Sequence, residues 1–405
     1  MRKEGRSAED ILTELEQGQR REPSVHDGRL FGLVYPSSRP DLEELIAEVT
    51  RRYLFGNALN PFKFTELAAL ERQVIAAVGA LVNVPQGGGG TMTSGGTESI
   101  LMSMLVNRER ARARGIDRPQ ILAPVSAHPA YAKAAHYFGM ELVHFPLDSG
   151  YRADVLAAAP LVTPATAVVV ASAFSYPYGT MDPVSSLATL AAEHGIGCHV
   201  DACIGGFVLP FLERLGRDVP PWDFRVDGVT EISVDVHKYG YCPKGASVIL
   251  HRDPDWFGHQ VFLYDDWPSG LYGSPAMAGA RPAAPIAAAW AAINYLGVEG
   301  YTEMMRGLME TVAKVRSGIE ELPGLEVVGD PIGPVLAFRS DRVDLFAVAD
   351  VMDDRGWNLN RNTSPPGLHV MLSPAHADVV DELLADLHFA VAHHGESRGT
   401  EARYS

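Results

Sequence analysis

The sequence predicts an α/β fold in which one large, mostly parallel sheet carries helices on both faces and a small α/β domain follows at the C-terminus. From about residue 40, short apolar stretches alternate with longer stretches of helical periodicity, the pattern of strands separated by crossover helices. Residues 167–173 form an almost uninterrupted apolar run, as expected for a parallel strand buried on both faces. The chain has 405 residues, enough for one large domain and a smaller one.

The elements of the large domain can be assigned in order along the chain. The predicted helices are residues 8–17, 42–53, 65–81, 98–114 and 183–194. The predicted strands are residues 121–125, 141–145, 167–173, 197–201, 231–236 and 246–251. Gly115 and Gly195 directly follow two of these helices, where glycine commonly ends a helix. Apart from the first helix, residues 1–30 are polar and show no core pattern.

A second, smaller pattern occupies the end of the chain. A long helical stretch runs from Pro285 to about Glu321, with breaks expected at Gly297 and Gly300. It is followed by predicted strands at 325–328, 335–339 and 369–372 and predicted helices at 345–355 and 377–392. The chain therefore divides into an N-terminal segment (1–55), a large domain (56–295), a small C-terminal α/β domain (296–395) and a disordered polar tail (396–405).

The composition argues against several classes of function. The formal net charge is −16 without a basic stripe, which disfavours nucleic acid as a partner. Cys198, Cys203 and Cys242 show no metal-binding spacing, so neither a metal site nor a disulfide framework is expected. No apolar stretch is long enough to cross a bilayer, and the N-terminus lacks the apolar run of a signal peptide. We therefore expect a cytoplasmic protein without a transmembrane segment.

A glycine-rich segment at residues 87–98 is the first candidate for chemistry. It leads directly into a predicted helix, and a helix start offers free N–H groups and the positive end of a dipole to an anion. Because glycine lets the backbone approach a phosphate closely, Gly95, Gly96 and Thr97 are the candidate phosphate-binding residues. The segment matches neither the nucleotide-triphosphate loop nor the dinucleotide fingerprint. A flexible loop before a capped helix is the alternative.

Two further candidates follow predicted strands. Asp201 ends the strand at 197–201, and α/β sheets bind ligands at the carboxyl ends of their strands; capping of the next helix is its alternative role. His128 lies between the strand at 121–125 and the following helical segment. There it can stack on a flat ring or transfer a proton, or it is simply a histidine near a helix start.

Lys238, just after the apolar strand at 231–236, is the most specific candidate. Lysine is rarely buried without a chemical role, and a partly desolvated amine readily forms an imine with a carbonyl. The alternative is a strand-end lysine whose amine reaches solvent. Lys244 is either a second anion ligand or a surface charge. In chain order, the phosphate-binding loop, His128, Asp201 and Lys238 predict a site for pyridoxal 5'-phosphate (PLP), whose ring nitrogen requires an acidic partner.

The same segments resemble those of fold-type I PLP enzymes of the group II decarboxylase superfamily and, within it, the sphingosine-1-phosphate lyases. The segments that carry the resemblance are residues 93–100, 199–207, 236–245 and 270–275, and similarity extends from about residue 30 to 390. The resemblance implies that Lys238 bonds to the cofactor, Asp201 meets the pyridine nitrogen and His128 stacks on the ring. It also implies that the cofactor phosphate is held by Gly96, Thr97 and His237.

The resemblance further implies a homodimer with shared active sites. Gly273 and Ser274 would then reach the cofactor of the neighbouring subunit. Tyr176 matches a family tyrosine near the reacting bond and would assist proton transfer; packing at a strand end is the alternative role. Together with Lys238 and His128, it completes the predicted catalytic set.

Four residues are candidates for holding a small, anionic amine substrate. Tyr35 and Lys244 occupy phosphate-binding positions of the family. Lys63 stands where the lyases have a histidine that helps bind the substrate phosphate, and lysine still binds an anion as a point charge. Arg361 is unexpected for an amine substrate and suits a carboxylate instead.

The resemblance implies a PLP-dependent lyase that cleaves the Cα–Cβ bond of a phosphorylated or otherwise anionic β-hydroxy amine by a retro-aldol reaction, releasing an aldehyde and an amine. An amino-acid α-decarboxylase is the first alternative, because Arg361 and the superfamily motifs fit it. A non-catalytic PLP-fold partner protein is the second.

Overall fold

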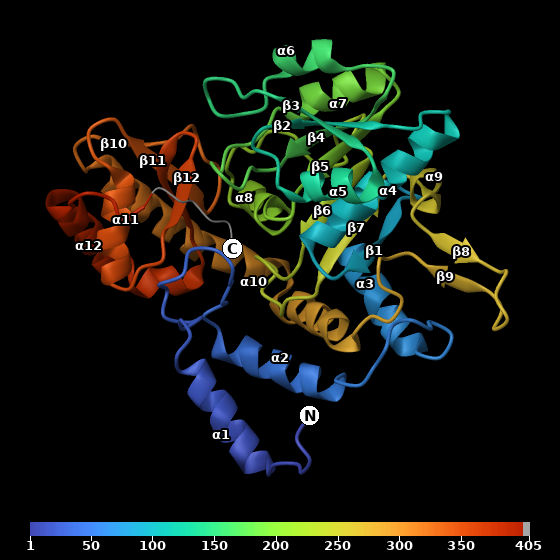
Figure 1. Ribbon diagram of the computed structural model, residues 1–405, viewed down its shortest axis with the longest axis horizontal. Helices are drawn as coiled ribbons and strands as arrows, with labels where there is room; N and C mark the ends of the chain where they lie inside the picture. Colours follow the sequence, from blue (N-terminus) through green and yellow to red (C-terminus); the bar gives the residue numbers. More distant parts are fainter. Residues whose placement is uncertain (400–405) are drawn as a thin grey trace.

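The computed structural model, described here for residues 1–399, has two α/β parts, as predicted (Figure 1). The larger part is built on a seven-stranded sheet with the order β1-β7-β6-β5-β4-β2-β3. Its strands are β1 (Gly89–Thr93), β2 (Gln120–Pro124), β3 (Glu141–Phe145), β4 (Thr166–Ser172), β5 (Gly197–Asp201), β6 (Glu231–Asp235) and β7 (Ser247–His251). Strands β2 to β6 pair in parallel, whereas β7 runs antiparallel to both of its neighbours. The predicted mostly parallel sheet is confirmed.

Helices cover both faces of this sheet. The helices of the large part are α2 (Pro40–Arg52), α3 (Thr65–Leu81), α4 (Gly96–Ala113), α5 (Ala130–Phe138), α6 (Val155–Ala158), α7 (Val184–Glu193), α8 (Leu209–Arg214) and α9 (Pro254–Gly258), with short 3-10 turns at Ala159–Leu161 and Gly205–Phe207. The interior strand β4 is buried along its whole length. Val168 and Val170 belong to the core beneath α4 and α5, and Val169 and Ala171 belong to the core on the opposite face, because successive strand side chains point to opposite sides.

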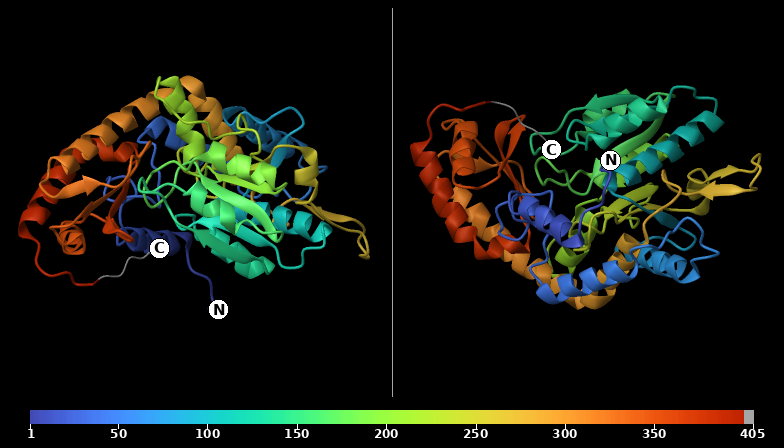
Figure 2. Two further views of the ribbon diagram at one scale, coloured as in Figure 1. Left: turned by 90° about the horizontal axis from the view of Figure 1, so that it is seen from above. Right: turned by 60° about the horizontal axis from the view of Figure 1, so that its bottom comes forward.

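The long helix α10 (Ala283–Glu320) joins the large part to the small one (Figure 2). The predicted break at Gly297 is confirmed, with φ 57° and ψ −174°, and it lies beside the proposed domain boundary. The predicted break at Gly300 is wrong, because that residue stays helical. The small antiparallel sheet has the order β10-β11-β13-β12. Its elements are β10 (Leu325–Val327), β11 (Val335–Ser340), α11 (Leu345–Asp354), β12 (Asn360–Thr363), β13 (Pro366–Met371), a 3-10 turn (Pro374–Asp378) and α12 (Val380–His393).

Four strands were not predicted. Strand β1 lies inside the glycine-rich segment, where a Cβ on Gly90 would lie 1.9 Å from the Ile249 carbonyl oxygen; glycine here permits a close approach of backbones. Strand β12 is short and polar. Strands β8 (Phe262–Tyr264) and β9 (Tyr272–Ser274) form a hairpin that projects from the large part (Figure 1, right).

The two ends of the chain differ in their contacts. Helix α1 (Ala8–Gln19) buries none of its side chains. In the predicted disordered tail, the Arg398 backbone N–H donates to Asp350 at 2.6 Å, and residues 400–405 lie outside the described part of the chain. Within residues 1–399, no helix has the length and apolar character needed to cross a membrane.

Asp182, just before α7, provides a test of the packing around β4. It is 2% exposed, and its carboxylate accepts the backbone N–H groups of Ala153 and Ser172, each at 2.8 Å. Burial raises its pKa from 3.8 to about 6. The folded state therefore binds this proton more tightly than the unfolded chain, and the stabilisation is full below about pH 4 and lost as the pH rises through about 6.

We expect the free energy of unfolding of the wild type to lose about 3 kcal/mol across this range relative to Asp182→Asn, since one pKa unit corresponds to about 1.4 kcal/mol. Urea unfolding of both proteins between pH 4 and pH 7 measures the difference. Parallel pH profiles for the two proteins would contradict the assignment.

Candidate active site

A cavity of about 380 Å³ opens at the carboxyl ends of β4, β5 and β6. These ends are contributed by Ser172, Asp201 and Asp235, one from each strand. The predicted site residues that line the cavity are Tyr35, Gly95, Gly96, Thr97, His128, Tyr176, Asp201, His237, Lys238 and Lys244. Residues from distant parts of the sequence thus meet at the edge of the sheet where α/β folds bind ligands.

Lys238 is held by an ion pair with the last residue of β6. Its Nζ lies 3.0 Å from Asp235 Oδ2, and the Asp235 side chain is 1% exposed. Burial opposes the charge of Lys238, but the Asp235 carboxylate prevails and raises the lysine pKa well above its usual value. Burial likewise works against the charge of Asp235, and Lys238 and His237 hold the carboxyl pKa below its ordinary value. The amine is therefore fixed in place and charged.

The start of α4 forms a cradle for an anion. Gly95 precedes the helix without a side-chain cap, so no side chain at that position occupies the first-turn N–H groups. A Cβ on Gly96 would lie 2.8 Å from both Asp235 Oδ2 and Cys203 Sγ, and a Cβ on Gly95 would lie 3.3 Å from the His237 ring. Glycine is therefore required at Gly96, where the helix start meets the buried ion pair.

His237 is neutral and oriented. The Ala246 backbone N–H donates to His237 Nδ1 at 3.2 Å, so the ring proton lies on Nε2. Burial lowers the pKa of His237 to about 4. The Nε2–H group is thus available as a neutral donor beside the helix start.

His128 and Asp201 face the cavity from neighbouring elements. The Ala130 backbone N–H donates to His128 Nδ1 at 3.1 Å, which fixes the ring at the start of α5. Burial lowers the pKa of His128, with Asp201 acting in the opposite direction, so the ring is neutral near pH 7. The Cys203 backbone N–H donates to Asp201 Oδ1 at 3.1 Å. A flat neutral ring and a carboxylate therefore share one cavity.

The remaining part of the cavity contains a second lysine and two tyrosines. Lys244 Nζ lies 4.4 Å from the centre of the Tyr35 ring and donates to the His237 carbonyl oxygen at 3.4 Å. Burial, followed by the charge of Lys238, lowers the pKa of Lys244 to about 8. Tyr176 lines the same cavity. Two amines at one site create a local preference for an anion.

Four predicted residues do not line this cavity. Lys63 is an exposed residue of the loop between α2 and α3. Gly273 and Ser274 lie on the projecting hairpin, away from the cavity of their own chain. Arg361 lines a neighbouring pocket that shares His128 and Tyr176 with the cavity. Its Nη2 donates to Asp350 at 2.9 Å and to Asp353 at 2.8 Å, and its role as a carboxylate ligand stays a prediction. Its guanidinium is neutralised within the small domain.

The lining residues that sequence reasoning missed include Ser126, Cys203 and Asp235. Asp235 had a signal, because a carboxylate three residues before a strand-end lysine is positioned to pair with it. Cys203 and Ser126 are small residues two positions away from Asp201 and His128, and no sequence pattern marked them as site residues.

The donor set fits PLP. The start of α4 and His237 would hold the phosphate, His128 would stack on the ring, Asp201 would meet the ring nitrogen, and Lys238 would bond to the aldehyde carbon; all of these residues line the cavity. Among the described lining residues, the buried Ser126 Oγ has no hydrogen-bond partner, and Ser126 stands two positions before His128 in the cavity wall.

Comparisons with known proteins agree with this geometry. Residues 41–341 match the pyridoxal-dependent decarboxylase conserved domain. The chain is 42% identical over 369 residues to the sphingosine-1-phosphate lyase of Oryza sativa, with 89% of this chain and 68% of the relative covered. The chain belongs to the sphingosine-1-phosphate lyase group of the pyridoxal-dependent decarboxylase family. It is therefore a PLP-dependent lyase.

Solved structures show the same relationship. The sphingosine-1-phosphate lyase of Burkholderia pseudomallei superposes with a TM-score of 0.94 at 38% identity, covering 97% of this chain and 92% of that one. The glutamate decarboxylase of Lactobacillus brevis superposes with a TM-score of 0.84 at 20% identity, which shows a shared fold. The mouse lyase is 38% identical, and this family member covers 66% of its length.

The Lys238–Asp235 ion pair predicts how the apoprotein takes up PLP. Only the neutral amine attacks an aldehyde, so a raised lysine pKa slows the reaction at neutral pH. In Asp235→Asn we expect the pH profile for the rate of PLP uptake to shift to lower pH. Stopped-flow absorbance after mixing with PLP measures the rate, and Lys238→Ala is the control that should show no covalent uptake. An unshifted profile would contradict the proposed role of Asp235.

Proposed function

We propose that this lyase cleaves the Cα–Cβ bond of a phosphorylated or otherwise anionic β-hydroxy amine, releasing an aldehyde and an amine. The names of the relatives support this substrate class, because the rice and Burkholderia proteins are sphingosine-1-phosphate lyases. The single observation that carries the proposal is the partly buried Lys244 amine on the Tyr35 ring. It places a cation for the anionic group in the same cavity as the Lys238 amine.

The side chains of the cavity divide the chemical work. Bound PLP supplies an electron sink for the bond that breaks. Asp201 would stabilise a proton on the ring nitrogen, and His128 would stack on the ring. Tyr176 would assist the transfer of the proton that leaves the substrate hydroxyl as the bond breaks, the step that turns the alcohol into an aldehyde. The apolar walls formed by Leu33, Phe174 and Ile204 exclude water from the reacting atoms.

An amino-acid α-decarboxylase is the second candidate function, because the matching domain is a decarboxylase domain. The placement of Arg361 disfavours it, since Asp350 and Asp353 already bind that guanidinium. Among the described lining residues the cations are Lys238 and Lys244. The non-catalytic alternative is excluded by the family assignment.

We also propose a homodimer in which the β8–β9 hairpin packs on a second copy. Phe262, Leu263 and Tyr264 are 59%, 64% and 47% exposed, and exposed apolar residues in one patch are typical of an interface. Gly273 and Ser274 sit on the same hairpin, and Lys63 lies in a loop that also exposes Phe62. These residues would contribute to the neighbour's active site.

Product analysis by mass spectrometry tests the proposed reaction. PLP-loaded protein is incubated with phosphorylated β-hydroxy amines and with amino acids. We expect an aldehyde and a phosphorylated amine fragment from the first set. An amine lighter than an amino-acid parent by one carboxyl group would instead establish a decarboxylase.

The pKa of Lys244 predicts how the KM for an anionic substrate depends on pH. Its pKa of about 8 means that its cationic form declines as the pH rises through that value. We expect the KM for a phosphorylated substrate to rise above about pH 8 in the wild type. In Lys244→Met the KM should be high, by on the order of tenfold, and independent of pH in this range. Steady-state kinetics with a phosphorylated substrate and its unphosphorylated analogue measure both effects. An equal KM increase for the two substrates would remove Lys244 from the anion site.

A further inference from the structure

The loop that carries Tyr176 starts from the large sheet but is held by the small domain. It follows β4, and its last part approaches β11. Asn362 Nδ2 on β12 donates to the Pro177 carbonyl oxygen at 2.8 Å. The Tyr178 hydroxyl donates to the carbonyl oxygen of Ser364, in the turn between β12 and β13.

Gly179 completes this attachment. The Ile332 backbone N–H donates to the Gly179 carbonyl oxygen at 3.2 Å. A Cβ on Gly179 would lie 2.1 Å from the Val335 carbonyl oxygen on β11, and its φ is +70°. Glycine is therefore required where the loop meets the small sheet.

The Tyr176 ring itself rests on the small domain. Its centroid lies 4.6 Å from the centroid of the His369 imidazole, with 36° between the planes. His369 is fully buried on β13. Burial lowers its pKa to about 4, and a hydrogen bond to the Tyr176 backbone acts in the opposite direction. The imidazole is thus a neutral, fixed support for the tyrosine.

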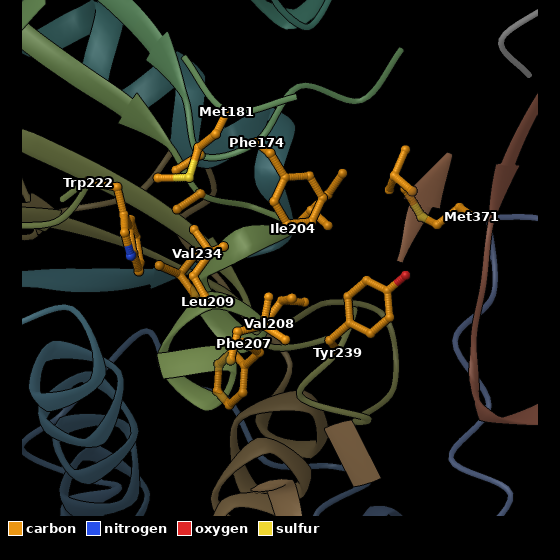
Figure 3. Close-up of a cluster of buried hydrophobic side chains, with 14 of the residues drawn as sticks. Phe174, Met181, Ile204, Phe207, Val208, Leu209, Trp222, Val234, Tyr239 and Met371 are labelled. Atoms are coloured by element: carbon orange, nitrogen blue, oxygen red, sulfur yellow. The ribbon is translucent and has the colours of Figure 1, made fainter. Parts of the chain in front are cut away.

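Strand β13 also contacts the anion-binding end of the cavity. His369 and Met371 are two residues apart and so share one face of the strand. The Tyr35 hydroxyl donates to Met371 Sδ at 3.0 Å. The Lys244 Nζ lies 4.4 Å from the centre of the same Tyr35 ring. Figure 3 shows Met371 on its strand beside the large-domain core, with the Tyr239 hydroxyl turned toward it.

We propose that the β12–β13 hairpin is the positioning element for Tyr176, with His369 and Asn362 as positioning residues, and that β13 ties Tyr176 to the Tyr35–Lys244 anion site. The attachment of the Tyr176 loop to the hairpin is argued from the contacts alone. Its effect on catalysis rests on the proposed function. A catalytic group displaced by about 1 Å loses on the order of a hundredfold in rate. A strand that touches both groups therefore couples the bound anion to the placement of the Tyr176 ring.

Asn362→Ala tests the catalytic consequence. Asn362 is partly exposed, so its removal leaves the core intact. With a phosphorylated β-hydroxy amine we expect kcat to fall about tenfold, while KM and PLP occupancy stay unchanged. In a Tyr176→Phe background, Asn362→Ala should cause no further loss, because the residue acts through the tyrosine. Losses that add in the double variant would overturn the proposal.

A matched control is available in Asn294. Its Nδ2 donates to the Trp290 carbonyl oxygen at 2.8 Å on helix α10, the same kind of side-chain to backbone bond in a place that does not touch the Tyr176 loop. Asn294→Ala should leave kcat unchanged. A loss equal to that of Asn362→Ala would show that the effect is general and would also overturn the proposal.

Hydrogen exchange tests the attachment without turnover. The loop contains the backbone bonds Ser175 N–H to Thr180 and Gly179 N–H to Ser175, each 2.9 Å long. Asn362→Ala should speed exchange in residues 172–181, as seen by mass spectrometry of the PLP-loaded protein, and Asn294→Ala should not. Unchanged exchange would refute the attachment. Faster exchange in a protein that cleaves none of the proposed substrates would refute the proposed function and leave the attachment standing.

Discussion

The buried ion pair between Lys238 and Asp235 is the interaction on which the rest of the site depends. Breaking a buried pair by removing one partner typically costs about 3–5 kcal/mol, so each residue constrains the other. The carboxylate ends β6, the lysine lies in the following turn, and the pair fixes where the amine stands relative to the sheet. His237 Nε2 lies 3.7 Å from the same carboxylate oxygen. The requirement for glycine at Gly96 follows, because Asp235 and Cys203 occupy the space of any side chain there.

Local charge opposes the charge of the whole molecule. A formal net charge of −16 repels anions at long range, whereas the cavity contains two lysine amines and the start of α4. Affinity for an anion therefore depends on short-range contacts. Lys238 keeps its charge through Asp235, and Lys244 loses part of its own through burial and the neighbouring lysine. The two amines differ because one has a carboxylate partner and the other has an aromatic face.

Local patterns allowed much of this architecture to be predicted from the sequence. Buried strands such as β4 are apolar on both faces, and Asp201 and Lys238 follow such strands directly. Interactions between distant residues left no local trace. The hydrogen bond from Asn362 Nδ2 to the Pro177 carbonyl oxygen joins residues 185 positions apart, and nothing near either residue in the sequence indicates it. Strand β1 was hidden because it begins with two glycines, of which Gly90 packs closely against the backbone of β7.

The cavity combines two halves with different origins. The residues that fit PLP come from the strand ends and helix starts of the large sheet. The tyrosines rest on the small domain: Tyr176 on His369, and Tyr35 on Met371. The segment that leads to Tyr35 is also held against the small domain. Leu30 forms a β-bridge with Asn358, and Asn360 Nδ2 donates to the Phe31 carbonyl oxygen at 2.6 Å. Because the fold shared across this family fixes the first half, the orientation of the small domain determines how a substrate meets the cofactor.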